Sequence, residues 1–131
     1  MKAYYFLIAG CLLAFASCHN RNYYRHHDNN ISISVEESDD EYQMIAFFDE
    51  DKTKQVQSRI DEYTGHNGIF RSGNVEIDAT TTLEDNVRVY IRSRPGRLKI
   101  KFDKEDNSEA ACEKVKEMCE EIKEYLTNGQ P

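Results

Sequence analysis

Alternating apolar and polar residues along the middle of the chain predict a set of strands. Period-two patterning is typical of a strand with one buried face. It occurs at residues 31–35, 42–48, 75–79, 87–91 and 98–102. A four-residue turn at 37–40 places Val35 opposite Tyr42 and Ile33 opposite Met44, on one face of a predicted hairpin.

The last two of these strands predict a second hairpin. A Pro-Gly turn at 95–96 puts Ile91 opposite Ile100. Because L-Pro-Gly favours turn types whose twist suits a tight hairpin poorly, we expect a bulge or a looser turn there. The strand before this hairpin is predicted to pair with it through Ala79 and Val89.

Helical spacing of apolar residues predicts two helices. Residues 49–63 begin with an acidic turn, which favours the positive end of the helix dipole, and carry a narrow apolar stripe of Val56, Ile60 and Tyr63. A second helix begins where Asp106 and Glu109 have capping-box spacing, and it ends near Asn128-Gly129. Its longer apolar face consists of Cys112, Val115, Cys119, Ile122 and Leu126.

These elements predict a single α+β domain over residues 31–127, followed by a short tail at 128–131. The expected architecture has two layers, with a five-strand, mainly antiparallel sheet and both helices on its apolar face, in the order ββαβββα. The order of strands within the sheet stays open. Ile45 and Phe47 point to the face away from the helices and need covering at that end.

The first eighteen residues have the pattern of a secretory signal peptide. Lys2 precedes an apolar run from 3 to 16 that is shorter than the about 20 residues a membrane-spanning helix needs. The residues at the end of this run, Phe15-Ala16-Ser17-Cys18, resemble the lipobox of bacterial lipoproteins. This resemblance implies a signal at 1–17 and an acylated Cys18. Cleavage after Ala16 is the alternative and leaves a soluble chain that begins at Ser17.

The cysteines favour the lipid anchor. Of the four cysteines in the chain, Cys11 leaves with the signal. Cys112 and Cys119 are seven residues apart on one helix face, about 10.5 Å, which is too far for a disulfide and indicates two small buried side chains. Cys18 is then an unpaired thiol in an oxidising compartment, and acylation would account for it.

Composition narrows the function classes. The chain has 131 residues and a formal net charge of −7, which argues against a general nucleic-acid-binding protein and against electrostatic docking on an anionic membrane. We found no catalytic motif of the G-x-S-x-G, H-E-x-x-H or P-loop type, and we expect no cofactor. The chain is therefore expected not to be an enzyme.

A run of basic residues offers a candidate binding face. Between Arg88 and Lys101 there are six basic residues, no acid and an interleaved Tyr90. The candidates on the outer sheet face are Arg88, Tyr90, Arg92, Lys99 and Lys101. The predicted register sets Glu76 opposite Arg92, Asp78 opposite Tyr90 and Asp103 opposite Arg88, so a salt-bridged exterior is the alternative to an anion-binding face.

Residues 19–30 predict a polar tether between the anchor at Cys18 and the domain, so that the tether as a whole covers 18–30. The segment contains His19, His26 and His27, and imidazole suits zinc, copper and nickel. Adjacent histidines lack the spacing of a closed zinc site, so a solvated linker is the alternative.

Four segments, ISISVEESDD, KTKQVQSRIDEY, DATTTLEDN and PGRLKIKFDKEDNS, resemble those of small uncharacterised secreted or lipid-anchored bacterial proteins. This resemblance implies no activity. The leading hypothesis is an exported cell-envelope lipoprotein, anchored in a membrane, that binds another protein or an anionic envelope component through its outer sheet face. The alternatives are a secreted inhibitor or small-ligand-binding protein, and a metal carrier that uses the N-terminal histidines.

Overall fold

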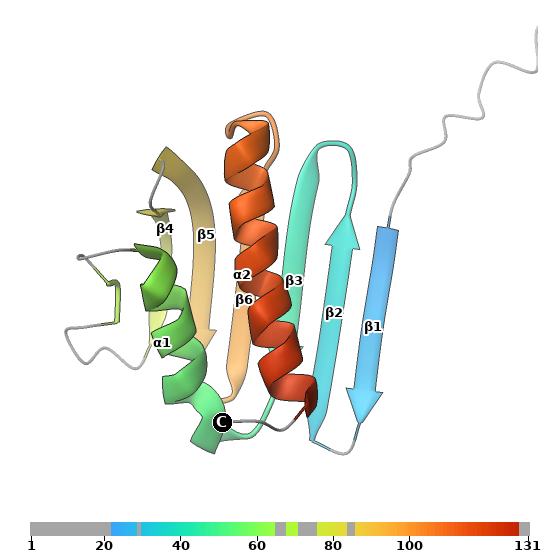
Figure 1. Cartoon of the computed structure of the whole chain (residues 1–131). Coiled ribbons are helices and arrows are strands. Elements are labelled where there is room, and N and C mark those ends of the chain that lie inside the picture. Colours follow the sequence, from blue (N-terminus) through green and yellow to red (C-terminus); the bar gives the residue numbers. More distant parts are fainter. Residues whose placement is uncertain (1–21, 29, 65–67, 71–75, 84–85, 129–131) are drawn as a thin grey trace, which may run out of the picture.

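The fold is an antiparallel sheet with two helices on one face (Figure 1). The computed structural model describes residues 22–28, 30–64, 68–70, 76–83 and 86–128. The strands are β1 (Asn22–Asp28), β2 (Ile31–Glu37), β3 (Glu41–Phe47), β4 (Ile77–Leu83), β5 (Val87–Arg94) and β6 (Arg97–Asp103). A short 3-10 helix, η2 (Glu50–Lys52), leads into α1 (Thr53–Thr64), and α2 (Glu109–Asn128) ends the described chain.

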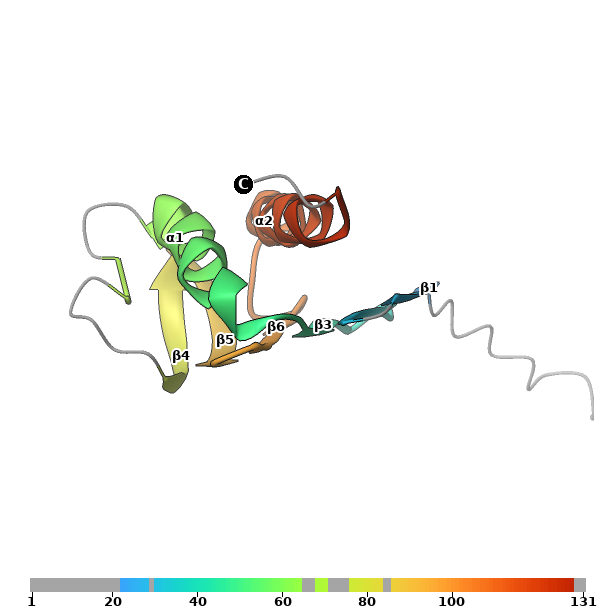
Figure 2. The same ribbon diagram turned by 90° about the horizontal axis from the view of Figure 1, so that it is seen from below.

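The six strands lie in the order β1-β2-β3-β6-β5-β4. Both helices cover the same face, and Figure 2 shows β1 at the edge beyond α2. In the described part of the chain, the opposite face carries no helix. We call this second face the open face. The predicted α+β class and the placement of both helices on one face are confirmed.

The predicted number of strands was wrong, because part of the expected tether is a strand. Residues Asn22–Asp28 form β1, which pairs with β2 from Asn22–Glu37 to Asp28–Ile31. Of the β1 side chains whose burial is described, Tyr23 and Tyr24 are 55% and 38% exposed and give no burial signal. Backbone pairing rather than apolar alternation places β1 in the sheet, so the sequence pattern could not reveal it.

The predicted register of the first hairpin was wrong by two residues. Val35 pairs with Met44 and not with Tyr42, because Glu37 still belongs to β2 and the turn contains only residues 38–40. Ser38 closes this turn, since its backbone N–H donates to the Glu41 carbonyl at 2.9 Å. A shift of two residues keeps the same side chains on the same face, so the predicted core face is correct.

The second hairpin differs from the prediction in two places. Ile91 pairs with Ile100 as predicted, but Ala79 pairs with Ile91 instead of Val89. The turn has no bulge, since Arg94 pairs directly with Arg97 around two residues. Gly96 makes this possible with a φ of 73°, a conformation that suits the third position of a type II turn.

Backbone contacts of Gly96 fix the turn against the rest of the domain. Its N–H donates to Thr53 Oγ1 and its carbonyl accepts from the Phe48 N–H, both at 2.9 Å. A Cβ at this position would lie 2.7 Å from the Phe48 carbonyl oxygen, so no other residue fits without displacement. The turn between β5 and β6 is therefore tied to the start of α1.

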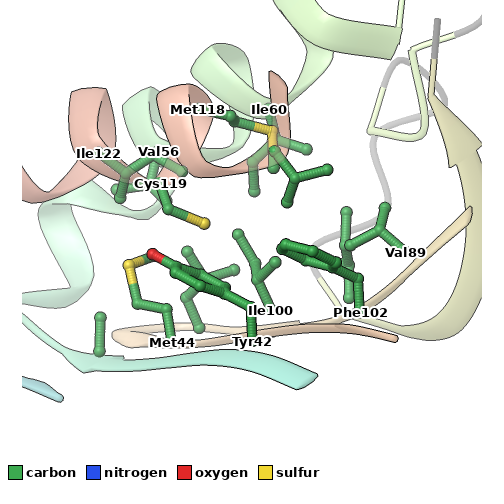
Figure 3. Close-up of a cluster of buried hydrophobic side chains, with 14 of the residues drawn as sticks. Tyr42, Met44, Val56, Ile60, Val89, Ile100, Phe102, Met118, Cys119 and Ile122 are labelled. Atoms are coloured by element: carbon green, nitrogen blue, oxygen red, sulfur yellow. The ribbon is translucent and has the colours of Figure 1, made fainter. Parts of the chain in front are cut away.

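The core fills the space between the sheet and the helices (Figure 3). The rings of Tyr42 and Phe102 stack with centroids 5.1 Å apart, beneath α2. Cys119 hydrogen-bonds with Tyr42, and burial together with the nearby charge of Glu120 raises the pKa of its thiol to about 12. Cys112 and Cys119 are both buried free cysteines, as the sequence predicted.

The second helix starts later than the capping-box pattern predicted. Ser108, not Asp106, is the capping residue, since its Oγ accepts from the Ala111 N–H at 3.1 Å. All five apolar residues of the predicted stripe are buried.

No helix in the described part of the chain is long and apolar enough to cross a membrane.

An ion-pair cluster joins α2 to the sheet. Glu37 Oε2 lies 2.8 Å from Lys104 Nζ and 2.6 Å from Lys116 Nζ. Burial alone would raise the pKa of Glu37, but the hydrogen bonds and charges of the two lysines outweigh it, so the pKa is lowered. This cluster stabilises the contact between β2 and α2.

Candidate functional site

The five candidate binding residues all lie on the open face. The alternate residues Val87, Val89 and Ile91 of β5 are buried against the helices, so Arg88, Tyr90 and Arg92 point the other way. Pairing with β6 places Lys101 opposite Tyr90 and Lys99 opposite Arg92, as predicted. The structure therefore brings the five side chains onto one continuous surface.

One end of this surface is a broad hollow of about 440 Å³. Its lining includes Arg88, Tyr90, Lys99 and Lys101, four of the five candidates, and two acids, Asp103 and Asp106. Charges of both signs therefore share this hollow.

The side chain of Asn107 takes the place of strand pairing beside this hollow. The last pair between β5 and β6 that we observe is Tyr90–Lys101. Beyond it, Asn107 Oδ1 accepts from the Arg88 N–H at 2.8 Å. Asn107 Nδ2 donates to the carbonyls of Arg88 and Asp103 at 3.0 and 2.8 Å. Sequence patterns do not reveal this role, because Asn107 lies among the polar residues of a loop.

Acids neutralise part of the open face. The Tyr90 hydroxyl donates to Asp78 at 2.6 Å, and this bond to a carboxylate raises the pKa of Tyr90. Asp78 is also the cross-strand partner of Arg92, with its Oδ2 3.8 Å from Arg92 Nε. Glu41 Oε2 lies 3.4 Å from Lys101 Nζ. The predicted partners were wrong, since Asp78 and not Glu76 faces Arg92, but a partly salt-bridged exterior is present.

The other end of the open face combines basic side chains with apolar ones. Arg92 lies opposite Lys99, and Arg94 lies opposite Arg97. Pairing of β3 with β6 then places Ile45 beside Lys99 and Phe47 beside Arg97. We call these six residues (Ile45, Phe47, Arg92, Arg94, Arg97 and Lys99) the cationic array. They line a hollow of about 170 Å³ together with Ala46 and Leu98.

Among the residues that the structure describes, no acid forms an ion pair with Arg94, Arg97 or Lys99. The Arg97 guanidinium instead lies 5.5 Å from the centre of the Phe47 ring, a cation–π contact, and Phe47 is 45% exposed. The array thus combines unneutralised cations with an exposed apolar wall. Chemically, this arrangement is suited to an anion that carries an apolar group.

The remaining predicted site residues are the lipidation candidate Cys18 and the metal candidates His19, His26 and His27. Cys18 and His19 lie outside the described residues. His26 and His27 belong to β1, but the placement of their side chains is not described. Within the described part of the chain, no three His, Cys, Asp or Glu side chains are grouped closely enough to hold a metal ion.

Comparisons with known proteins add no relative to this picture. No protein-family model matches the chain, and searches of the curated proteins and of the solved structures found no significant match.

Proposed function

We propose that this protein is a non-enzymatic binding module of the bacterial cell envelope, exported and anchored by a lipid on Cys18, that engages its partner through the open face of the sheet. The observation that carries the proposal is the cationic array: Arg94, Arg97 and Lys99, which have no acidic partner among the described residues, border an apolar hollow on a face that neither α1 nor α2 covers.

The distribution of charge supports this choice of face. The net charge of the chain is −7, and the exposed side of α2 carries Glu113, Glu117, Glu120 and Glu124. The open face carries a basic cluster instead. An acidic partner would therefore be repelled from the helical side and attracted to the sheet side, which fixes the orientation of docking.

The additional strand, β1, shortens the link between the domain and the proposed anchor. Since β1 begins at Asn22, the four residues from Cys18 to Arg21 span at most about 14 Å, and an acylated Cys18 would hold the domain close to the membrane surface. Cross-strand pairing puts Asn22, Glu37 and Tyr42 in one row across β1, β2 and β3. Phe47 lies five residues further along β3. The array thus lies about 17 Å along the strands from the row where the anchor segment enters the sheet.

The anchor is tested by the intact mass of the natively expressed protein, measured separately in the membrane and soluble fractions. The proposal predicts a membrane-bound species that begins at Cys18 and carries added acyl mass. It also predicts that Cys18→Ser moves the protein to the soluble fraction. A soluble species beginning at Ser17 would show that the lipid anchor is wrong.

The binding face is tested by charge reversal. Lys99→Glu and Arg92→Glu are expected to weaken capture of envelope components at least fivefold while the folded far-UV spectrum is retained. The matched control is Lys54→Glu, because Lys54 is exposed on α1 and the charge change is identical. Equal capture by all three variants and the wild type would rule out the open face.

A further inference from the structure

We infer that the cationic array binds an acidic peptide segment of a partner protein, in which one apolar side chain lies between two carboxylates. This inference rests on the proposed function and specifies the chemistry of the partner at the same face.

The register of three strands gives the array its shape. Arg92 and Lys99 form one cross-strand pair, and Arg94 and Arg97 form the next pair on the same face. Directly opposite side chains have Cβ atoms about 5 Å apart, and residues two apart on a strand are about 7 Å apart. The four cations therefore occupy the corners of a small rectangle, which two carboxylates separated by one residue can match.

A third column of the array is apolar. In the neighbouring strand β3, Ile45 pairs with Lys99 and Phe47 pairs with Arg97. The hollow of about 170 Å³ beside them has the volume of about six water molecules, well below the range of pockets that bury drug-sized ligands. It therefore accommodates one aliphatic or aromatic side chain and excludes burial of a long acyl chain.

Placing like charges opposite each other has a cost that the fold does not need. Directly opposed like charges destabilise a sheet, and the structure contains two such pairs side by side. Arg94, Arg97 and Lys99 have no acidic partner among the described residues. Carboxylates from a ligand would relieve the repulsion, and arginine can bind each of them through two parallel hydrogen bonds.

A peptide fits the surroundings of the array better than an extended anionic surface. Acidic side chains occupy the same open face, with Asp78 beside Arg92 and Glu41 beside Lys101. A membrane or a nucleic acid presents negative charge over the whole face and would be repelled by these acids. A short segment meets the four cations without covering the flanking carboxylates.

The test titrates the purified mature protein with three capped, fluorescein-labelled tripeptides and follows anisotropy. Their sequences are Glu-Leu-Glu, Gln-Leu-Gln and Glu-Gly-Glu. We expect Glu-Leu-Glu to bind at least tenfold more tightly than either of the others. Its affinity should fall with increasing salt, since the contacts are ionic. Amide shifts in an NMR titration are expected at Ile45, Phe47 and Arg97.

Variants separate the array from the rest of the face. Arg94→Glu and Arg97→Glu are each expected to weaken Glu-Leu-Glu binding at least tenfold. Lys54→Glu, with the same change in net charge, is expected to leave it unchanged. Equal weakening by all three variants would show a general charge effect and would overturn the assignment.

Other outcomes would also overturn it. Equal binding of Glu-Gly-Glu would remove the apolar side chain from the proposal. Binding of vesicles that contain anionic lipid, lost in Arg94→Glu, would assign the array to a membrane. Self-association in sedimentation, lost in the same variant, would assign it to a second copy of this chain. If the peptides fail to bind while Lys99→Glu still weakens envelope capture at least fivefold, the peptide chemistry is wrong and the proposed function stands.

Discussion

Reversing one charge of the cationic array should make the domain more stable. Arg94 is exposed and lies directly opposite Arg97, with Arg92 two residues away on the same strand and Lys99 diagonally across. Arg94→Glu replaces a like-charge pair by an opposite-charge pair. Each kind of cross-strand pair changes stability by about 0.2–1 kcal/mol, in opposite directions, so the expected gain is on the order of 0.5–1.5 kcal/mol.

Thermal unfolding at low ionic strength measures this gain. For a domain of this size, 1 kcal/mol corresponds to about 4–8 °C in Tm, so Tm should rise by about 2–12 °C. Arg94→Gln removes the repulsion without adding an attraction and should lie between the wild type and Arg94→Glu. In 1 M salt the Debye length falls to about 3 Å, shorter than the pair separation, and most of the difference should disappear.

Lys54→Glu is the control for net charge, since both changes take the formal charge from −7 to −9. On α1 the added negative charge has no basic array to meet, so Tm should stay unchanged or fall slightly. The reasoning is refuted if Arg94→Glu is no more stable than the wild type at low salt. It is also refuted if the gain persists undiminished in 1 M salt.

Three further changes test how the fold supports this face. Gly96→Ala should cost about 1–3 kcal/mol in a urea melt, because φ is positive and the new Cβ meets the Phe48 carbonyl at 2.7 Å, whereas Pro95→Ala should cost under about 1 kcal/mol. Asn107→Ala should cost about 1–2 kcal/mol and speed hydrogen exchange at Arg88, while Asn107→Asp should preserve the Arg88 N–H bond. Glu37→Gln should lower stability by about 1–2 kcal/mol at pH 7. Since the folded pKa of Glu37 lies below its unfolded value, this difference should be full above the unfolded pKa and vanish as the pH falls through the folded pKa; a difference that is constant with pH would contradict the assignment.

Apolar periodicity predicted the elements whose side chains are buried. The stripe from Cys112 to Leu126 and the alternation in β2, β3, β5 and β6 follow directly from contact with the core. Strand β1 escaped the prediction because its place in the sheet depends on backbone hydrogen bonds at an edge. Two registers were wrong by two residues, since alternation fixes the face of a side chain but not its partner across the strand.

The candidate site could likewise be predicted only in part from the sequence. The basic run and the outward direction of Ile45 and Phe47 are both readable from the sequence. Their meeting is not, because it depends on β3 pairing with β6, two strands separated by residues 48–96. Strand order is a long-range property, and local patterns carry no information about it. For this reason the prediction included Arg92 and Lys99 but not the apolar column beside them.

Site-specific photo-crosslinking in intact cells tests the central claim most directly. A photoreactive amino acid in place of Ser34 lies beside Ile45 on the open face without removing any residue of the cationic array. Ser58, exposed on α1, is the matched control position. The account predicts a discrete adduct from position 34 that disappears when Arg94→Glu is added, and no such adduct from position 58. The same adducts from both positions, or an adduct at position 34 that is unaffected by Arg94→Glu, would contradict it.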